Sequence, residues 1–212
     1  MKRRLSAFQR REQILTQASR IFAQKGFRGT TTREIARAAG ISEALMFKHF
    51  PSKASLYRAI IQRRMGSSEE IYFPKEYVQA KDDRQVFRSI ASYLIRKNTE
   101  DPAFMRQLLY SALEGHELAR YFFEHYAMER TRLLSEYIEA RIREKGYRKV
   151  PPLLAARAFI GMIIHYAMAQ EVYGMKKLFH FPEEQVVDTF VDIFLEGLKG
   201  KNSECPRRTK AR

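Results

Sequence analysis

The sequence is poor in cysteine and in long apolar runs, and each shortage excludes a class of protein. Cys205 is the only cysteine among the 212 residues, which excludes an intrachain disulfide and a cysteine-ligated metal cluster and favours a reducing compartment. The longest apolar stretch, residues 158–169, includes His165 and is well short of the roughly 20 residues that span a bilayer. We expect this stretch to form a buried helix, and we expect no membrane partner.

The N-terminus also lacks the apolar segment of a secretory signal, because Phe8 is followed at once by polar and charged residues (Gln9, Arg10, Arg11 and Glu12). The sequence therefore predicts a protein that stays in the cytoplasm.

Acidic residues are scarce at the two ends of the chain. The whole sequence has 39 Lys and Arg residues against 24 Asp and Glu residues, which gives a formal net charge of +15. Residues 1–66 carry 15 basic and 3 acidic side chains, residues 67–198 carry 18 and 20, and residues 199–212 carry 6 and 1. This segregation indicates either a polyanionic partner for the basic ends or a strongly solvated surface.

Strand signals are nearly absent, whereas apolar residues recur every three or four positions, so the predicted fold class is all-α with about nine helices in total. Four helices are expected in the basic third, over residues 8–24, 32–39 and 42–49 and from Ser52 onward. Further helices are expected over residues 84–99, 102–113, 117–145 with a candidate break near His125, 152–173 and 183–198. A composition change at about residues 66–75 marks a domain boundary. The predicted domains are therefore residues 1–66, residues 67–200 and a basic disordered tail over residues 201–212.

Residues 31–50 have the pattern of a helix-turn-helix. Thr31 and Glu34 have the spacing of a capping box, Gly40 can adopt the positive φ that a three-residue turn requires, and Ser42 is placed to cap the second helix. An apolar set is spaced to point into a core shared with the first helix: Ile35, Ala36, Ala39, Ile41, Met46 and Phe50. An isolated pattern of this kind is often only a packing motif, but here it coincides with the strongest positive charge in the chain.

The side chains left outward on the second helix suit the DNA major groove. Ala44 and Leu45 can contact thymine methyl groups, and Glu43 can accept a hydrogen bond from a cytosine amino group, so these three are the candidate base-reading residues. Phosphate contacts are expected from basic side chains and from the first turn of the preceding helix. These candidate backbone-contacting residues are Thr31, Thr32, Arg33, Phe47, Lys48, His49 and Lys53.

The run from Gly26 to Leu56 resembles the N-terminal DNA-binding domain of the TetR/AcrR family of regulators. The resemblance rests on Gly26-Phe27, Thr32-Arg33-Glu34-Ile35-Ala36, Ala39-Gly40-Ile41-Ser42, His49-Phe50, and Lys53 with Leu56, all in the family's order and spacing. The family usually has tyrosine at the position of Phe47, so a phosphate contact through that hydroxyl is unavailable here.

The resemblance implies a homodimer that binds a palindromic double-stranded operator and is released by a small-molecule effector, most often as a repressor. Periodicity independently suggests that the last two long helices pair with their copies, although the same pattern fits an ordinary intrachain core. The candidate dimer residues are Ala158, Gly161, Val187, Phe190, Val191 and Phe194.

An effector cavity is expected among the aromatic and methionine residues of the middle helices, most of which must be core. An apolar or amphipathic effector would need apolar walls and a few convergent polar groups. The candidate pocket residues are Gln107, Tyr110, Phe123, Met162, His165 and Tyr166.

Enzyme chemistry finds little support in the sequence. The five histidines, at positions 49, 116, 125, 165 and 180, show no metal-ligand spacing, and no glycine-rich phosphate loop is present. We therefore expect neither a catalytic residue nor a metal nor a cofactor. The alternative to a specific regulator is a protein that binds nucleic acid or anionic membrane without sequence preference through its basic ends.

Overall fold

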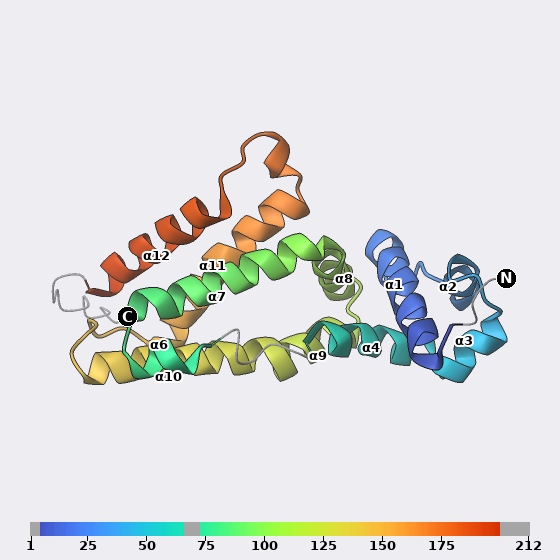
Figure 1. Cartoon of the computed structure of the whole chain (residues 1–212), viewed down its shortest axis with the longest axis horizontal. Helices are drawn as coiled ribbons and strands as arrows, with labels where there is room; N and C mark the ends of the chain where they lie inside the picture. Colours follow the sequence, from blue (N-terminus) through green and yellow to red (C-terminus); the bar gives the residue numbers. More distant parts are fainter. Residues whose placement is uncertain (1–4, 66–72, 200–212) are drawn as a thin grey trace, which may run out of the picture. The chain divides into compact units, whose positions relative to one another are not determined.

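A computed structural model describes residues 5–65 and 73–199, and within these ranges it contains helices and no strand. The predicted all-α fold class is therefore confirmed (Figure 1). The predicted disordered tail and Cys205 lie outside the described residues, as does most of the expected boundary segment.

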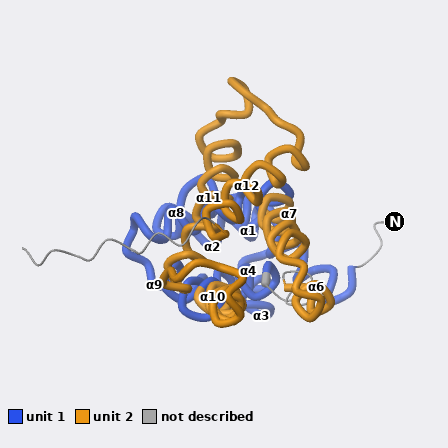
Figure 2. The backbone as a smooth tube through the Cα atoms, turned by 90° about the vertical axis from the view of Figure 1, so that its left-hand side faces the viewer, with its two compact units in different colours: residues 1–68, 98–127 blue, residues 69–97, 128–212 orange. Residues whose placement is uncertain are grey.

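The chain divides into two compact units, which Figure 2 shows in different colours. The first unit comprises residues 1–68 and 98–127, and the second comprises residues 69–97 and 128–212. The first break, after residue 68, lies close to the predicted boundary, but residues 98–127, which we expected in the second domain, pack with the N-terminal helices.

The first unit contains α1 (Ala7–Lys25), α2 (Thr32–Ala38), α3 (Glu43–His49), α4 (Lys53–Met65), α8 (Pro102–Leu113), α9 (Glu117–Phe122) and a π-helical turn (Phe123–Ala127). Its core joins Ile14, Phe22, Ile35 and Met46 from the N-terminal helices to Phe104 of α8, and all five are fully or nearly fully buried. The predicted core positions Ile35, Ala36, Ala39, Met46 and Phe50 belong to this cluster, with Ile41 packed partly buried against it.

Buried polar contacts also join α8 to α1. The Gln107 amide nitrogen donates to the carbonyl and the hydroxyl oxygen of Ser19, at 2.7 Å each. Gln107 is 1% exposed, so these bonds are shielded from water. They explain why residues 98–127 belong with the N-terminal unit.

The second unit contains α6 (Lys75–Gln79), α10 (Met128–Arg143), α11 (Pro152–Glu171), a 3-10 turn (Met175–Lys177), α12 (Glu183–Lys199) and most of α7 (Asp83–Glu100). Phe87 and Phe159 lie at the centre of its core, with both side chains 0% exposed and ring centroids 4.8 Å apart. The predicted break near His125 corresponds to the π-helical turn, which separates α9 from α10.

The expectation of a buried apolar helix over residues 158–169 is only half right. Within α11, the side chains Ala156, Phe159, Ile163 and Ala167 are buried, a three-to-four spacing that covers one face. The helix is long and apolar enough to cross a bilayer, yet only 22% of its most apolar window is buried. Its other face is exposed among the residues that the structure describes.

Candidate nucleic-acid interface

The turn between α2 and α3 has the predicted helix-turn-helix geometry. Gly40 has a φ of +62°, which glycine adopts without the steric cost that a Cβ would bring. Ser42 is the N-cap of α3, and its hydroxyl accepts a hydrogen bond from the Leu45 amide at 3.1 Å. The start of α3 is therefore fixed by two local devices that the sequence predicts.

The outward side of α3 carries the candidate DNA residues. Ala44, Phe47 and Lys48 are exposed, while Leu45 and His49 are half-buried at the edge of the helix. Met46, in contrast, is fully buried and anchors α3 to the core. The helix thus presents small, apolar and basic side chains to the outside on a packed support.

Glu43 is hydrogen-bonded to Thr32. The Thr32 hydroxyl donates a hydrogen bond to the Glu43 carboxylate, which ties the first turn of α2 to the first turn of α3. The carboxylate keeps acceptor capacity for a second partner, because an ionised carboxylate has about four acceptor positions. Glu43 therefore remains available as a base-reading candidate, in an orientation set by Thr32.

The predicted phosphate contact of Thr31 is corrected by the structure. The structure confirms the capping box: the Thr31 hydroxyl accepts from the Glu34 amide, and the Thr31 amide donates to the Glu34 carboxylate at 3.0 Å. The hydrogen bond and ion pair with Lys25, at 2.6 Å, and the hydrogen bonds from Thr31 lower the pKa of Glu34 to about 2. The Thr31 amide is therefore already occupied and is not a free donor to a phosphate.

Lys53 acts mainly inside the unit. Its ammonium donates to the carbonyl oxygens of Phe27 and Thr30, at 2.7 and 2.8 Å, and lies 4.3 Å from the centroid of the Phe27 ring. Burial lowers the pKa of Lys53, an effect that the nearby Glu114 carboxylate opposes. Because an ammonium has three protons, one donor at most is left for a phosphate. Arg33 and Lys48, which are exposed, are the better phosphate candidates.

Sequence reasoning missed two residues that support this surface. Arg11 of α1 donates to the carbonyl of His49, the last residue of α3, at 2.9 Å, and its guanidinium lies 4.1 Å from the centroid of the Phe50 ring. The Glu114 carboxylate accepts from the amides of Phe27 and Arg28, at 3.1 and 3.3 Å. Both contacts join segments far apart in the sequence, so no local pattern indicates them.

The candidate effector residues do not form one pocket within either unit. Gln107, Tyr110 and Phe123 belong to the first unit, whereas Met162, His165 and Tyr166 belong to the second. Gln107 is corrected, because its amide is buried and bonded to Ser19 and so is not a free polar group of a cavity. Tyr110 donates its hydroxyl proton to the Gln24 carbonyl at 3.2 Å, and Phe123 and His165 are exposed.

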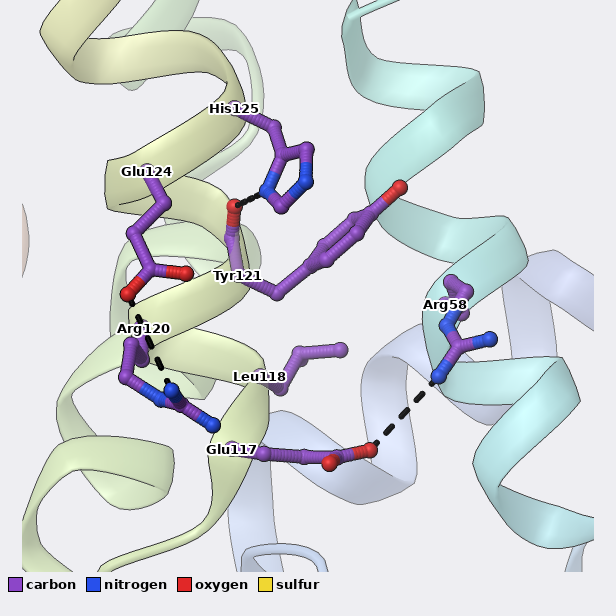
Figure 3. A pocket seen from close by; sticks show the side chains of 7 residues that line it. All are labelled: Arg58, Glu117, Leu118, Arg120, Tyr121, Glu124 and His125. Atoms are coloured by element: carbon purple, nitrogen blue, oxygen red, sulfur yellow. Dashed lines mark hydrogen bonds and ion pairs between the residues drawn. The ribbon is translucent and has the colours of Figure 1, made fainter.

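The first unit has a different, polar pocket of about 200 Å³. Figure 3 shows its lining: Arg58 of α4 reaches toward Glu117 of α9 at 3.6 Å, and Arg120 pairs with Glu124 at 3.8 Å. None of the predicted pocket residues lines it; the lining residues are Arg58, Glu117, Leu118, Arg120, Tyr121, Glu124 and His125. Its charges already pair with one another, so we assign it no effector.

The candidate dimer residues fall into three groups. Val187 and Val191 are 0% exposed in the core of their own unit, so they are corrected: a second chain cannot reach their side chains. Phe190 and Phe194 are half-buried against the same core. Ala158 and Gly161 lie exposed on the uncovered face of α11. Only the last two groups remain candidates.

Ion pairs between α7 and α12 fix the orientation of α12. Arg84 pairs with Asp188 at 3.2 Å and also with Asp192, and Arg88 pairs with Asp188. These contacts hold α12 beside α7, next to the buried face that carries the two valines.

Two family models match separate parts of the chain. Residues 14–60 match the model described as "Bacterial regulatory proteins, tetR family". Residues 84–197, more than half of the chain, match the model described as "AefR-like transcriptional repressor, C-terminal domain". The first match contains α2 and α3, and the second contains all of α8 to α11.

Individual proteins resemble the chain over most of its length. The HTH-type transcriptional regulator YvkB of Bacillus subtilis is 24% identical over 189 residues, which cover 88% of this chain and 96% of YvkB. The crystal structure of the TetR family regulator PfmR from Thermus thermophilus superposes with a TM-score of 0.66 at 20% identity, covering 86% of this chain and 97% of PfmR. AibR, crystallised in complex with isovaleryl coenzyme A and operator DNA, superposes with a TM-score of 0.65 at 23% identity, covering 87% of this chain and 97% of AibR.

The helix-turn-helix exposes basic and small side chains, as a DNA-binding helix requires. The two family matches indicate the same function. The chain belongs to the TetR family of bacterial regulatory proteins and is a DNA-binding transcriptional regulator.

Proposed function

We propose that this regulator is a homodimeric, cytoplasmic repressor that binds a roughly palindromic operator and leaves it when a small apolar or amphipathic effector binds. The observation that carries the proposal is the outward face of α3, where Ala44, Leu45 and Lys48 stand on a capped and packed helix. The match to an AefR-like transcriptional repressor domain supports repression.

The charge distribution supports a DNA partner for this unit. Residues 1–66 hold 15 basic and 3 acidic side chains, and such an excess attracts the phosphate backbone without reading sequence. In this proposal Glu43, Ala44 and Leu45 read bases, whereas Thr32, Arg33, Phe47, Lys48 and His49 contact the sugar-phosphate backbone. Lys53 and Arg11 hold the helices in place.

Two chains are needed for a palindromic site, because a two-fold operator presents its half-sites to a two-fold protein. We infer that the dimer forms through the uncovered face of α11, around Ala158 and Gly161, and the half-exposed rings Phe190 and Phe194 of α12. The support is the apolar composition of α11 together with the small share of it that its own chain buries.

The effector class is proposed from the fold neighbour AibR, whose structure holds isovaleryl coenzyme A together with operator DNA. Acyl thioesters of coenzyme A combine an apolar tail with a polar head group and are the first compounds to test. In our proposal, addition of the effector to an operator complex releases the DNA, which fluorescence anisotropy of a labelled duplex measures. A ternary complex that keeps both the effector and the DNA, as in the AibR crystal, would contradict the release.

A two-variant binding experiment tests the DNA assignment. Selection from a random DNA pool first supplies the operator. Lys48→Ala should weaken binding to all sequences alike and reduce the salt slope of log K by about 2, because the homodimer loses one phosphate contact in each protomer. Leu45→Ala should instead change the discrimination between bases by about 1–3 kcal/mol at each contacted position. The matched control is Lys75→Ala, which removes an exposed positive charge from α6 in the second unit.

The opposite results would contradict these roles. If Leu45→Ala and Lys48→Ala weaken every sequence equally, α3 does not read bases. If removing residues 200–212 abolishes binding while no sequence is selected, the chain binds DNA non-specifically through its basic ends.

A further inference from the structure

Among the described residues, Glu43 is the acidic side chain of the N-terminal segment that has no basic partner. Residues 1–66 contain three acidic side chains. Glu12 and Glu34 form ion pairs with basic side chains of α4 and α1, at 3.4 and 2.6 Å. The Glu43 carboxylate is bound, within the part of the chain that the structure describes, by the Thr32 hydroxyl alone. The described fold therefore leaves the charge of Glu43 uncompensated.

The bond to Thr32 occupies one of the two carboxylate oxygens. The Thr32 hydroxyl donates its single proton to Oε1 of Glu43, and Oε2 accepts no hydrogen bond from the described residues. Thr32 is the first residue of α2 and Glu43 the first residue of α3, and both are half-buried. The carboxylate thus has one oxygen held by the chain and one oxygen that can accept from an outside partner. The Thr32 hydroxyl proton is not available to a phosphate.

A carboxylate at the start of α3 is repelled by DNA phosphates unless a base donates a hydrogen bond to it. In the major groove the only donors are the amino groups of cytosine and adenine, whereas guanine and thymine present acceptors. The adenine amino group lies next to the N7 acceptor, which repels a carboxylate. On the major-groove edge of cytosine no acceptor lies beside the amino group. A single free carboxylate oxygen therefore favours cytosine.

Other contacts hold the backbone of α3 independently of this bond. The Ser42 hydroxyl caps the helix at its start. At its end, the Arg11 guanidinium donates to the carbonyl of His49 at 2.9 Å. Met46, which is 0% exposed, anchors the middle of the helix in the core. Removal of the Thr32 hydroxyl should therefore leave α3 in place and release only the side chain of the acidic residue.

We propose that Thr32 is a positioning residue for base recognition. Its hydroxyl holds the Glu43 carboxylate so that the free oxygen accepts from the amino group of one cytosine in each operator half-site. The inference rests on the proposed operator binding and adds the preferred base and the residue that orients its reader. Without the hydroxyl, the Glu43 side chain can occupy other staggered conformations, and the ordering lost in the free protein must then be supplied on binding.

Binding to single-base variants of the operator tests this role. Selection from a random DNA pool supplies the operator, and Glu43→Ala identifies the base pair at which its preference is lost. At that base pair, Thr32→Val should lower the preference for cytosine over thymine by about tenfold in one half-site. Valine keeps the side-chain shape and the backbone amide, and no charge is lost, so the salt slope should equal that of wild type. Thr32→Ser should restore the preference, because serine keeps the hydroxyl.

Two further variants separate positioning from a general loss of structure. Thr189→Val is the matched control, because it removes an exposed threonine hydroxyl from α12 in the other unit. It should change neither affinity nor base preference. Thr32→Val combined with Glu43→Ala should lower the cytosine preference no further than Glu43→Ala alone, since the hydroxyl acts through the carboxylate.

The outcomes distinguish this inference from the proposed function. If no sequence is selected from the pool, operator binding itself is refuted. If an operator is selected but Thr32→Val weakens every sequence equally, the hydroxyl contacts the backbone or supports the fold, and the positioning role is overturned. An unchanged cytosine preference in Thr32→Val, no preference lost in Glu43→Ala, or a preference for guanine or thymine at the Glu43 position would also overturn it while leaving the operator intact.

Discussion

The two compact units use polar side chains in different ways. In the first unit, Lys53 and Gln107 donate to backbone carbonyls, and Glu114 accepts from backbone amides. In the second unit, the central polar contact joins side chains only: Asp83 accepts from the guanidinium of Arg141 at 2.8 Å and from the hydroxyl of Tyr137 at 2.7 Å.

This difference in hydrogen bonding matches the different surfaces that the two units expose. The bonds from the Lys53 and Glu114 side chains to the backbone fix the position of the chain that leads into α2. The second unit instead exposes apolar surface along α11, and several of its ion pairs join α7 to α10 and α12. Polar contacts at different depths should therefore differ in strength, and three substitutions rank them.

Loss of the buried ion pair should have the largest effect. Asp83 is 6% exposed, and Asp83→Ala would remove the buried acceptor of both Arg141 and Tyr137. Arg141 would keep only its exposed partner Glu144, so the change should cost about 3 kcal/mol, the low end for breaking a buried ion pair. Urea unfolding at a fixed protein concentration measures the loss. Glu139→Ala, which removes an exposed carboxylate from α10, is the control and should change stability little.

Acid should reproduce this loss in the wild type. Burial raises the pKa of Asp83, but hydrogen bonds from Arg141 and Tyr137 outweigh burial and lower the pKa below its ordinary value of 3.8. A carboxyl with a lowered pKa stabilises the fold fully above its unfolded pKa, and that stability disappears as the pH falls through the folded pKa. An acid profile of wild type that matches that of Asp83→Ala would contradict this account.

Removal of the buried amide in the first unit should have an intermediate effect. Gln107 donates to Ser19 and also accepts at its backbone carbonyl from the Tyr57 hydroxyl, at 3.0 Å. Gln107→Leu keeps the backbone carbonyl but removes the donor to the buried Ser19 hydroxyl and the second hydrogen bond to the Ser19 carbonyl, at a cost of about 1–3 kcal/mol. Gln62→Leu, at an exposed position of α4, serves as the control; an equal loss in both variants would mean that the Gln107 bonds contribute nothing.

Local sequence signals predicted the helices well, because capping is decided by near neighbours. The Thr31–Glu34 capping box, the Ser42 N-cap and the positive φ of Gly40 all occur as predicted. The helix predicted over residues 102–113 has the same bounds as α8. The short helix α6 was missed; its N-cap, Pro74, makes no side-chain capping bond.

Long-range contacts explain the rest. A stripe of apolar residues on α12 does not tell which of them its own chain covers, and so Val187 and Val191 were assigned to the wrong surface. The contact of Glu114 with Phe27 spans 87 residues, and no periodicity indicates it. The DNA-reading roles of Glu43, Ala44 and Leu45 stay predictions, since they depend on a partner.

The exposed ion pair of the first unit should have the smallest effect and the strongest dependence on salt. Glu34→Gln preserves the capping geometry, since glutamine also satisfies the third helical position, but it removes the charge that faces Lys25 at 2.6 Å. A double-mutant cycle with Lys25→Met isolates this pair. Its coupling should shrink in 1 M salt, because exposed pairs are screened.

The pH dependence of this coupling distinguishes it from the buried pair. The pKa of Glu34 is about 2, so the coupling should be complete above the ordinary glutamate pKa and should fade as the pH falls toward 2. High salt should weaken it at every pH, whereas the Asp83–Arg141 contact, shielded from solvent, should resist salt and yield only to acid. A Lys25–Glu34 coupling that persists unchanged in 1 M salt would show that this pair is held as tightly as the buried one, and the distinction by depth would fail.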